Sequence, residues 1–159
     1  MAIFSSKEEE ISEELLKKSM DASKNAQEIV IDNTEEVVVT DKHSLAYLKA
    51  NGIDGESSID ILGSEDMFKN RLKEFEGLAK SKYGSLMDCK ANMDMKKYAQ
   101  ESAILKKEAN FLGINDLFIM AKAHEQKAIS GDTNYVIENF KEYEDEIMRV
   151  IKIIQEYIN

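Results

Sequence analysis

Two histidines and one cysteine are the residues of this 159-residue chain that could form a covalent intermediate most readily. An exposed imidazole nitrogen can attack an aspartyl phosphate and hold the phosphoryl group as a phosphoramidate. His124 has no second histidine one helical turn away, and the chain contains no Glu-x-x-His pair, so neither a zinc helix motif nor a di-iron bundle is expected. We therefore expect no metal and no other cofactor, and phosphoryl transfer through histidine is the chemistry to consider.

His124 lies in a segment where residues of one helical face repeat every three or four positions, in the order Leu117, Ala121, His124, Ala128. This spacing favours a part-buried histidine that finds a hydrogen bond in the core. Two alternatives stay open, a relocated phosphoacceptor and a pH-sensitive packing residue. His43 is expected to face solvent near the start of a short helix, and no lysine follows it in the register that a phosphoacceptor motif would need.

Cys89 is expected to be an inert thiol, because it ends a predicted helix with no histidine in local register. A single cysteine can form no internal disulfide, which fits a reducing compartment. No apolar run approaches the roughly 20 residues that cross a bilayer, and the acidic opening residues do not resemble a secretory signal. These features together predict a cytoplasmic protein with no membrane partner.

Net charge and composition indicate which partners are excluded and which fold class is expected. The formal net charge of −10, with no basic stripe to offset it, would repel phosphate backbones, so nucleic acid is not an expected partner. Hydrophobic residues make up 43% of the chain and charged residues 33%, which is typical of a folded soluble domain. Proline is absent while Glu, Lys, Leu and Ile are abundant, which predicts an all-α fold.

The hydrophobic periodicity predicts one N-terminal helix, at residues 7–30, followed by a linker at 31–41. A short helix is expected at 44–50, a turn with one helical turn at 52–63, and then four long helices. Short loops between long amphipathic helices imply antiparallel neighbours, so residues 41–159 are predicted to form an up-down four-helix bundle, with residues 1–40 as an added helix and linker. The four long helices are expected at about 64–91, 94–112, 115–130 and 133–157.

The predicted helix at 94–112 separates into distinct faces when it is projected at 100° per residue. Its expected core side carries Tyr98, Ser102, Leu105, Ala109 and Leu112. Its expected water side carries Lys96, Ala103, Lys107 and Asn110, with Lys106 beside them. Ile104 and Phe111 stack between the two sides, so this apolar pair is either wedged against a neighbouring helix or exposed for docking.

Three segments carry a family resemblance: "GSEDMFKNRLKEF" (63–75), "DMKKYAQESAILKKEANFLGINDL" (94–117) and "AKAHEQKAISGD" (121–132). In order and spacing they resemble the histidine-containing phosphotransfer (Hpt) domain. That family is a four-helix bundle that relays a phosphoryl group between receiver domains of two-component signalling. The likeness is best over about 52–145 and extends over 41–157, and residues 1–40 lie outside it.

The family's central motif, His-x-Leu-Lys-Gly or Ser followed by a helix-ending glycine, is only half present. Leu105, Lys106 and Gly113 occupy the leucine, lysine and glycine positions. Ala103 stands at the phosphoacceptor position, and Lys107 replaces the small residue that gives a receiver close approach. A methyl group cannot form a phosphoramidate, so the resemblance implies a pseudo-Hpt protein.

The expected function is therefore binding without catalysis, with a response-regulator receiver domain or a histidine kinase as partner and with a role as adaptor or competitive inhibitor. One alternative is an active phosphorelay intermediate that uses His124 or His43. Another is a structural bundle that forms a homodimer through its N-terminal helix. The expected partner-binding residues are Ala103, Ile104, Lys106, Lys107, Asn110 and Phe111.

Overall fold

The structure, a computed structural model, describes residues 41–159, and this part of the chain is built from helices. The all-α prediction is confirmed for these residues. The N-terminal helix and linker predicted for residues 1–40, and the dimerising role considered for them, lie outside the described residues. The helices are α3 (Leu45–Ala50), α4 (Glu56–Leu62), α5 (Glu65–Ala91), α6 (Met95–Leu112), α7 (Asn115–Ile129) and α8 (Thr133–Ile158).

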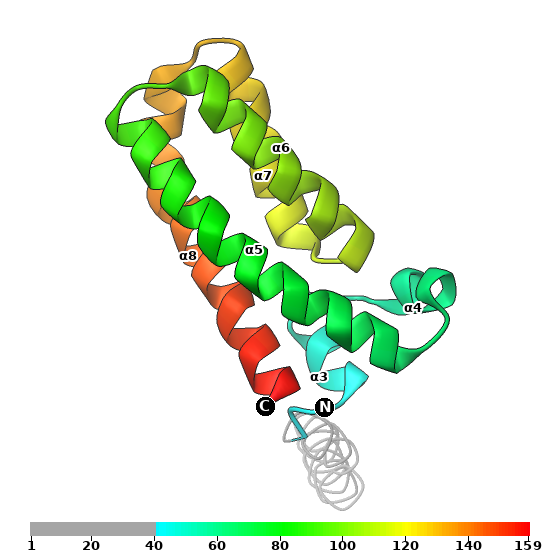
Figure 1. The fold of residues 1–159 in the computed structure, drawn as a ribbon. Helices are drawn as coiled ribbons and strands as arrows, with labels where there is room; N and C mark the ends of the chain where they lie inside the picture. Colours follow the sequence, from blue (N-terminus) through cyan, green and yellow to red (C-terminus); the bar gives the residue numbers. More distant parts are fainter. Residues whose placement is uncertain (1–40) are drawn as a thin grey trace, which may run out of the picture. The chain divides into compact units, whose positions relative to one another are not determined.

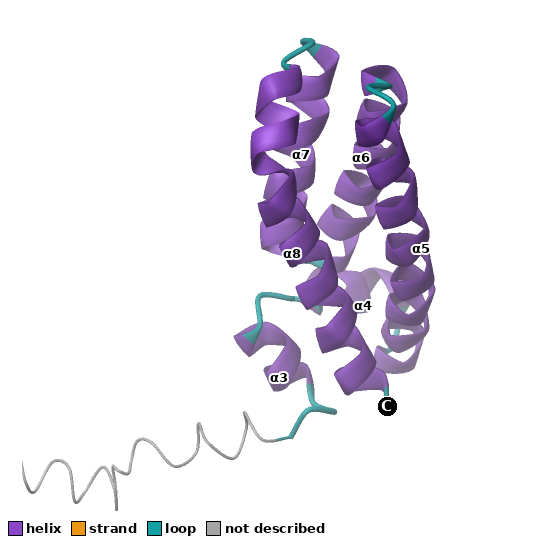
Figure 2. Ribbon diagram, turned by 90° about the vertical axis from the view of Figure 1, so that its left-hand side faces the viewer, coloured by secondary structure: helices purple, strands orange, loops and turns teal. Residues whose placement is uncertain are grey.

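The four long helices pack side by side, and each of them makes its most extensive contacts with two others. Helix α5 packs against α6 and α8, and α7 packs against the same two helices. Consecutive long helices run in opposite directions, which Figures 1 and 2 show from two sides. The two short helices lie at one end, where α3 contacts α8 and α4 contacts α5 and α6. Helix α6 is thereby held between α5 and α7.

Local capping signals explain where the long helices begin. The side chains of Ser64, Asp94 and Asp132 each accept a hydrogen bond from the backbone N–H three residues further on. Such a cap satisfies one of the donors that a helix leaves unpaired at its start and contributes about 1 kcal/mol. Helix α6 ends at Gly113, which adopts the left-handed conformation. The sequence predicted these starts and this end to within one residue.

The core lies between the long helices, and α8 supplies its longest apolar stripe. Burial of each large apolar side chain contributes roughly 1.5–3 kcal/mol, so this stripe alone is a major source of stability. The buried positions of this stripe alternate between steps of four and three, the spacing of one face of an α-helix. The buried residues of that face are Val136, Phe140, Tyr143, Ile147, Val150, Ile154 and Tyr157.

A close backbone contact joins the turn between α6 and α7 to the segment that follows α3. Ile53 and Ile114 form an isolated antiparallel bridge, and the Asp54 N–H donates to the Gly113 carbonyl at 2.9 Å. Gly113 has φ +78°, and a Cβ added there would lie 1.9 Å from the Asp54 carbonyl oxygen. Only glycine permits this approach, so position 113 fixes the end of α6 against the rest of the domain.

We expect Gly113→Ala to destabilise the protein by more than about 3 kcal/mol, because left-handed strain of about 1 kcal/mol adds to displacement of the Asp54 backbone. Urea unfolding followed by circular dichroism measures the change. Gly131→Ala is the matched control, since Gly131 has φ +79° but no atom within 4 Å of the added Cβ. Equal losses of stability in the two variants would show that the contact with Asp54 is unimportant.

Candidate functional site

Helix α6 turns one side into the core and the opposite side to solvent, as its sequence predicted. The predicted core residues Tyr98, Ser102, Leu105, Ala109 and Leu112 are all fully buried. We call the opposite side the open face. It carries exposed Lys96, Gln100, Lys107 and Asn110 and half-buried Ala103.

Lys106 points from the edge of the open face toward α7. Its Nζ lies 2.6 Å from Oε1 of Glu125, and the two side chains are 32% and 16% exposed. This contact is an ion pair between α6 and α7. The charge of Lys106 is therefore compensated inside the protein. Lys107, in contrast, is exposed and forms no ion pair within residues 41–159.

Ile104 and Phe111, the apolar pair expected beside the open face, have different surroundings. Ile104 is 37% exposed. Phe111 is half-buried, with the Arg71 guanidinium 4.7 Å from its ring centroid, and Arg71 donates to Glu108 at 2.9 Å. The Phe111 carbonyl accepts a hydrogen bond from the Ser58 hydroxyl of α4. Phe111 is thus partly wedged against its neighbours, and Ile104 is the member of the pair that is more available to a partner.

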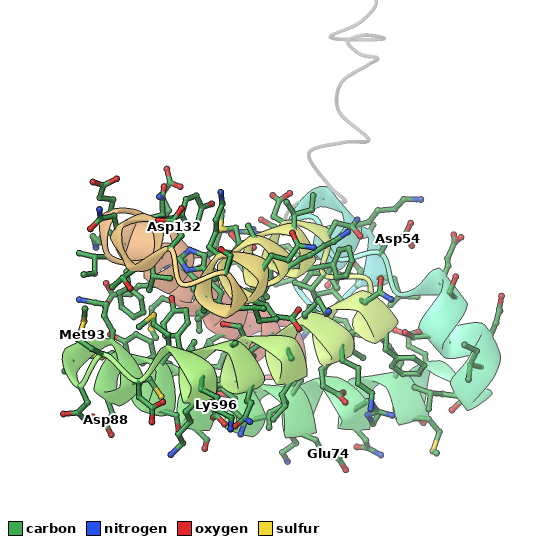
Figure 3. The ribbon with its side chains drawn as sticks, turned by 90° about the horizontal axis from the view of Figure 1, so that it is seen from above. Asp54, Glu74, Asp88, Met93, Lys96 and Asp132 are labelled. Carbon is green, nitrogen blue, oxygen red and sulfur yellow. The ribbon has the colours of Figure 1, made fainter. Side chains whose placement is uncertain are left out.

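Ala103 borders a groove between α6 and α7 with a volume of about 420 Å³. Three of its lining residues are alanines, whose short side chains leave the space between the helices unfilled. The groove reaches Lys96 near the start of α6, which is labelled in Figure 3. The groove was not predicted from the sequence, although the small side chains of Ala99, Ala103 and Ala128 indicate a position where two helices leave space between them. Its lining consists of Lys96, Ala99, Gln100, Ala103, Glu125, Ala128 and Ile129.

His124 lies inside the core and is only 2% exposed. Its Nδ1 is hydrogen-bonded to the Tyr98 hydroxyl at 2.8 Å, and its ring stacks on Tyr143 with centroids 4.2 Å apart. Burial lowers the pKa of His124 to about 4, against the opposing effect of a hydrogen bond with the Asn139 backbone. The predicted hydrogen-bonded core histidine is confirmed, and it is buried more fully than the part-buried residue that was predicted. This ring presents no accessible nitrogen to a phosphate donor.

The other candidate nucleophiles lie elsewhere. His43 is exposed, and its Nδ1 lies 3.1 Å from the Tyr157 carbonyl near the end of α8, away from the open face. Cys89 is buried, and desolvation raises the pKa of its thiol, which disfavours the reactive thiolate. Among residues 41–159, no group of three His, Cys, Asp or Glu side chains is arranged to hold a metal ion. No helix in this same range is long and apolar enough to cross a membrane.

No family model matches the chain, and the comparisons with curated proteins and with solved structures likewise give no match. The likeness to Hpt domains therefore rests on the sequence motif. A functional assignment has to be argued from the residues of α6 and their surroundings.

The contribution of His124 to stability should fall by about 3 kcal/mol as the pH is lowered from 6.5 to 4, because the unfolded chain takes up a proton at His124 over this range, while the folded protein stays largely neutral until the pH approaches 4. The folded pKa of His124 lies below its unfolded value, so the neutral form is the one that folding favours. Urea unfolding at several pH values measures this dependence.

The His124→Leu variant provides the comparison, since leucine does not titrate. It should be less stable than the wild type at pH 7, because the Tyr98 hydroxyl loses its partner at a cost of about 1–3 kcal/mol. Its stability should nevertheless depend less on pH between 6.5 and 4.5. Identical slopes for the two proteins would mean that burial of His124 does not disfavour protonation.

Proposed function

We propose that residues 41–159 are an up-down four-helix bundle of the Hpt type that binds a receiver domain, or a histidine kinase, without carrying phosphate. The protein acts by binding in the cytoplasm, as an adaptor or competitive inhibitor of a phosphorelay. One observation carries this proposal: α6 presents Ala103 and Lys107 on its open face, at the motif positions of the phosphoacceptor histidine and the small residue after it.

The chemistry of the open face supports binding without transfer. Phosphoryl transfer requires a nucleophilic nitrogen that a donor can reach, and Ala103 offers a methyl group. His124 cannot substitute for it, because its ring is buried behind α6 and bonded to Tyr98. The helix that carried the reaction in Hpt domains is thus retained here as a surface.

Lys107 is expected to make that surface selective for partners with carboxylate-rich sites. The active sites of receiver domains are rich in carboxylates, and an exposed ammonium opposite them makes charge-assisted contacts and speeds encounter. Lys106 is committed to Glu125, which leaves Lys107 to supply the charge. Ile104 adds apolar area beside it, and Asn110 adds a polar group one turn along the face. Because ion pairs hold α6 against its neighbours, these side chains are presented on a rigid element.

Lys107→Glu is expected to weaken binding of the receiver domain at least tenfold, because it removes an attraction and places like charges together. Isothermal titration calorimetry with purified receiver domains from the same organism measures the dissociation constant. Lys122→Glu is the matched control, since Lys122 is an exposed lysine on α7 outside the open face. If both variants bound the receiver as the wild type does, the docking face would not be on this side of α6.

The double variant Ala103→His with Lys107→Ser should gain the ability to accept phosphate, because it restores an exposed imidazole and a small residue one turn along the same face. Incubation with a radiolabelled, phosphorylated receiver domain should transfer label to this variant in an acid-labile, alkali-stable form. The wild type should bind the receiver and take up no label. Transfer of label to the wild type would contradict a purely binding role, and its loss in His124→Ala would then identify the acceptor.

A further inference from the structure

The groove between α6 and α7 has an apolar base of small side chains. Ala99 and Ala128 are 7% and 4% exposed, so their methyl groups form the base of the groove, and half-buried Ala103 borders it. Ala99 and Ala103 are four residues apart on one helix and therefore face the same way. A volume of about 420 Å³ falls within the range of roughly 300–1,000 Å³ typical of ligand pockets. The hollow can therefore hold a bulky side chain from outside.

The edges of the groove combine an apolar residue with a positive charge. Ile129, at the end of α7, is 69% exposed and adds an apolar side chain to the edge of the groove. Glu125 is the carboxylate in the lining, and Lys106 compensates its charge. Lys96 forms no ion pair within residues 41–159, so the groove carries one unpaired cation on a chain whose net charge is −10.

We propose that this groove receives a bulky apolar side chain from an amphipathic helix of the bound receiver domain, while Lys96 pairs with an acidic residue about one turn away on that helix. An apolar anchor seated between two helices is a recurring way in which a helix is recognised. This inference rests on the proposed function. It extends the contact from the open face of α6 onto α7, and Ala103 belongs to both surfaces.

Charge argues against a second copy of this chain as the occupant. A copy docked through the same surface would need an uncompensated carboxylate for Lys96, and the lining offers only Glu125, already paired with Lys106. It would also bring together two chains of net charge −10. A partner helix with one carboxylate beside its apolar side chain satisfies both the base of the groove and Lys96 at its edge, and it needs no net negative charge.

Two matched pairs of variants test the groove against the receiver domain that forms the complex. Ile129→Ser removes the apolar edge, and Ile119→Ser removes an isoleucine of the same helix that is 61% exposed and lies outside the groove. Lys96→Glu reverses the charge at the groove, and Lys97→Glu makes the same change at the next residue, also exposed. Isothermal titration calorimetry gives the dissociation constants, and thermal melting checks that each variant is folded.

Ile129→Ser and Lys96→Glu should each raise the dissociation constant at least about fivefold, the size of effect expected for a residue that anchors an interface. The two control variants should stay within about twofold of the wild type. A complex that all four variants form equally well would overturn the groove as a contact and leave the proposed function standing. If the wild type bound no receiver domain, both proposals would fail. A dimer in sedimentation equilibrium that Ile129→Ser abolishes would assign the groove to a second copy instead.

Discussion

The close backbone contact between Gly113 and Asp54 is the constraint on which the arrangement of α6 depends. An α-helix is stiff, and its residues are rotated by 100° from one to the next. Once the end of α6 is fixed at Gly113 and Leu112 is buried, the direction of every earlier side chain is fixed as well. Ala103, three turns before this point, has no freedom to turn into the core, and the open face follows from the position of the turn.

The polar groups inside the bundle reinforce this rotation. The Tyr143 hydroxyl of α8 donates to Ser102 Oγ at 3.0 Å, and the Tyr98 hydroxyl of α6 pairs with His124 of α7 at 2.8 Å. A buried polar group that loses its partner costs about 1–3 kcal/mol, so a rotated α6 would leave several groups unsatisfied. Apolar packing alone tolerates such slips more readily. These hydrogen bonds specify one alignment of the three helices.

The features that the sequence predicted well depend on neighbouring residues. The limits of α6 follow from the cap at Asp94 and the glycine at position 113, and its core side follows from periodicity. The pairing of Lys106 with Glu125 could not be predicted in this way, because it depends on how closely α6 approaches α7. Arg71 covers Phe111 for a similar reason, since 40 residues separate them in the chain. The groove was not predicted either, because its shape depends on how the surfaces of α6 and α7 fit together and not on the sequence of either helix alone.

Ala103 connects the two proposals through the volume of its side chain. An imidazole at this position would bring a reactive nitrogen to the open face and would also fill part of the space that borders Ala99 and Ala128. A histidine at position 103 would therefore reduce the groove that an alanine leaves open. An alanine suits the proposed binding role, because a methyl group is unreactive and leaves the groove open. Lys107 acts in the same direction, since its long charged side chain adds attraction for carboxylates where a small residue would give a receiver close approach. Under the proposed function, the two departures from the motif act together, because both favour holding a partner over carrying phosphate.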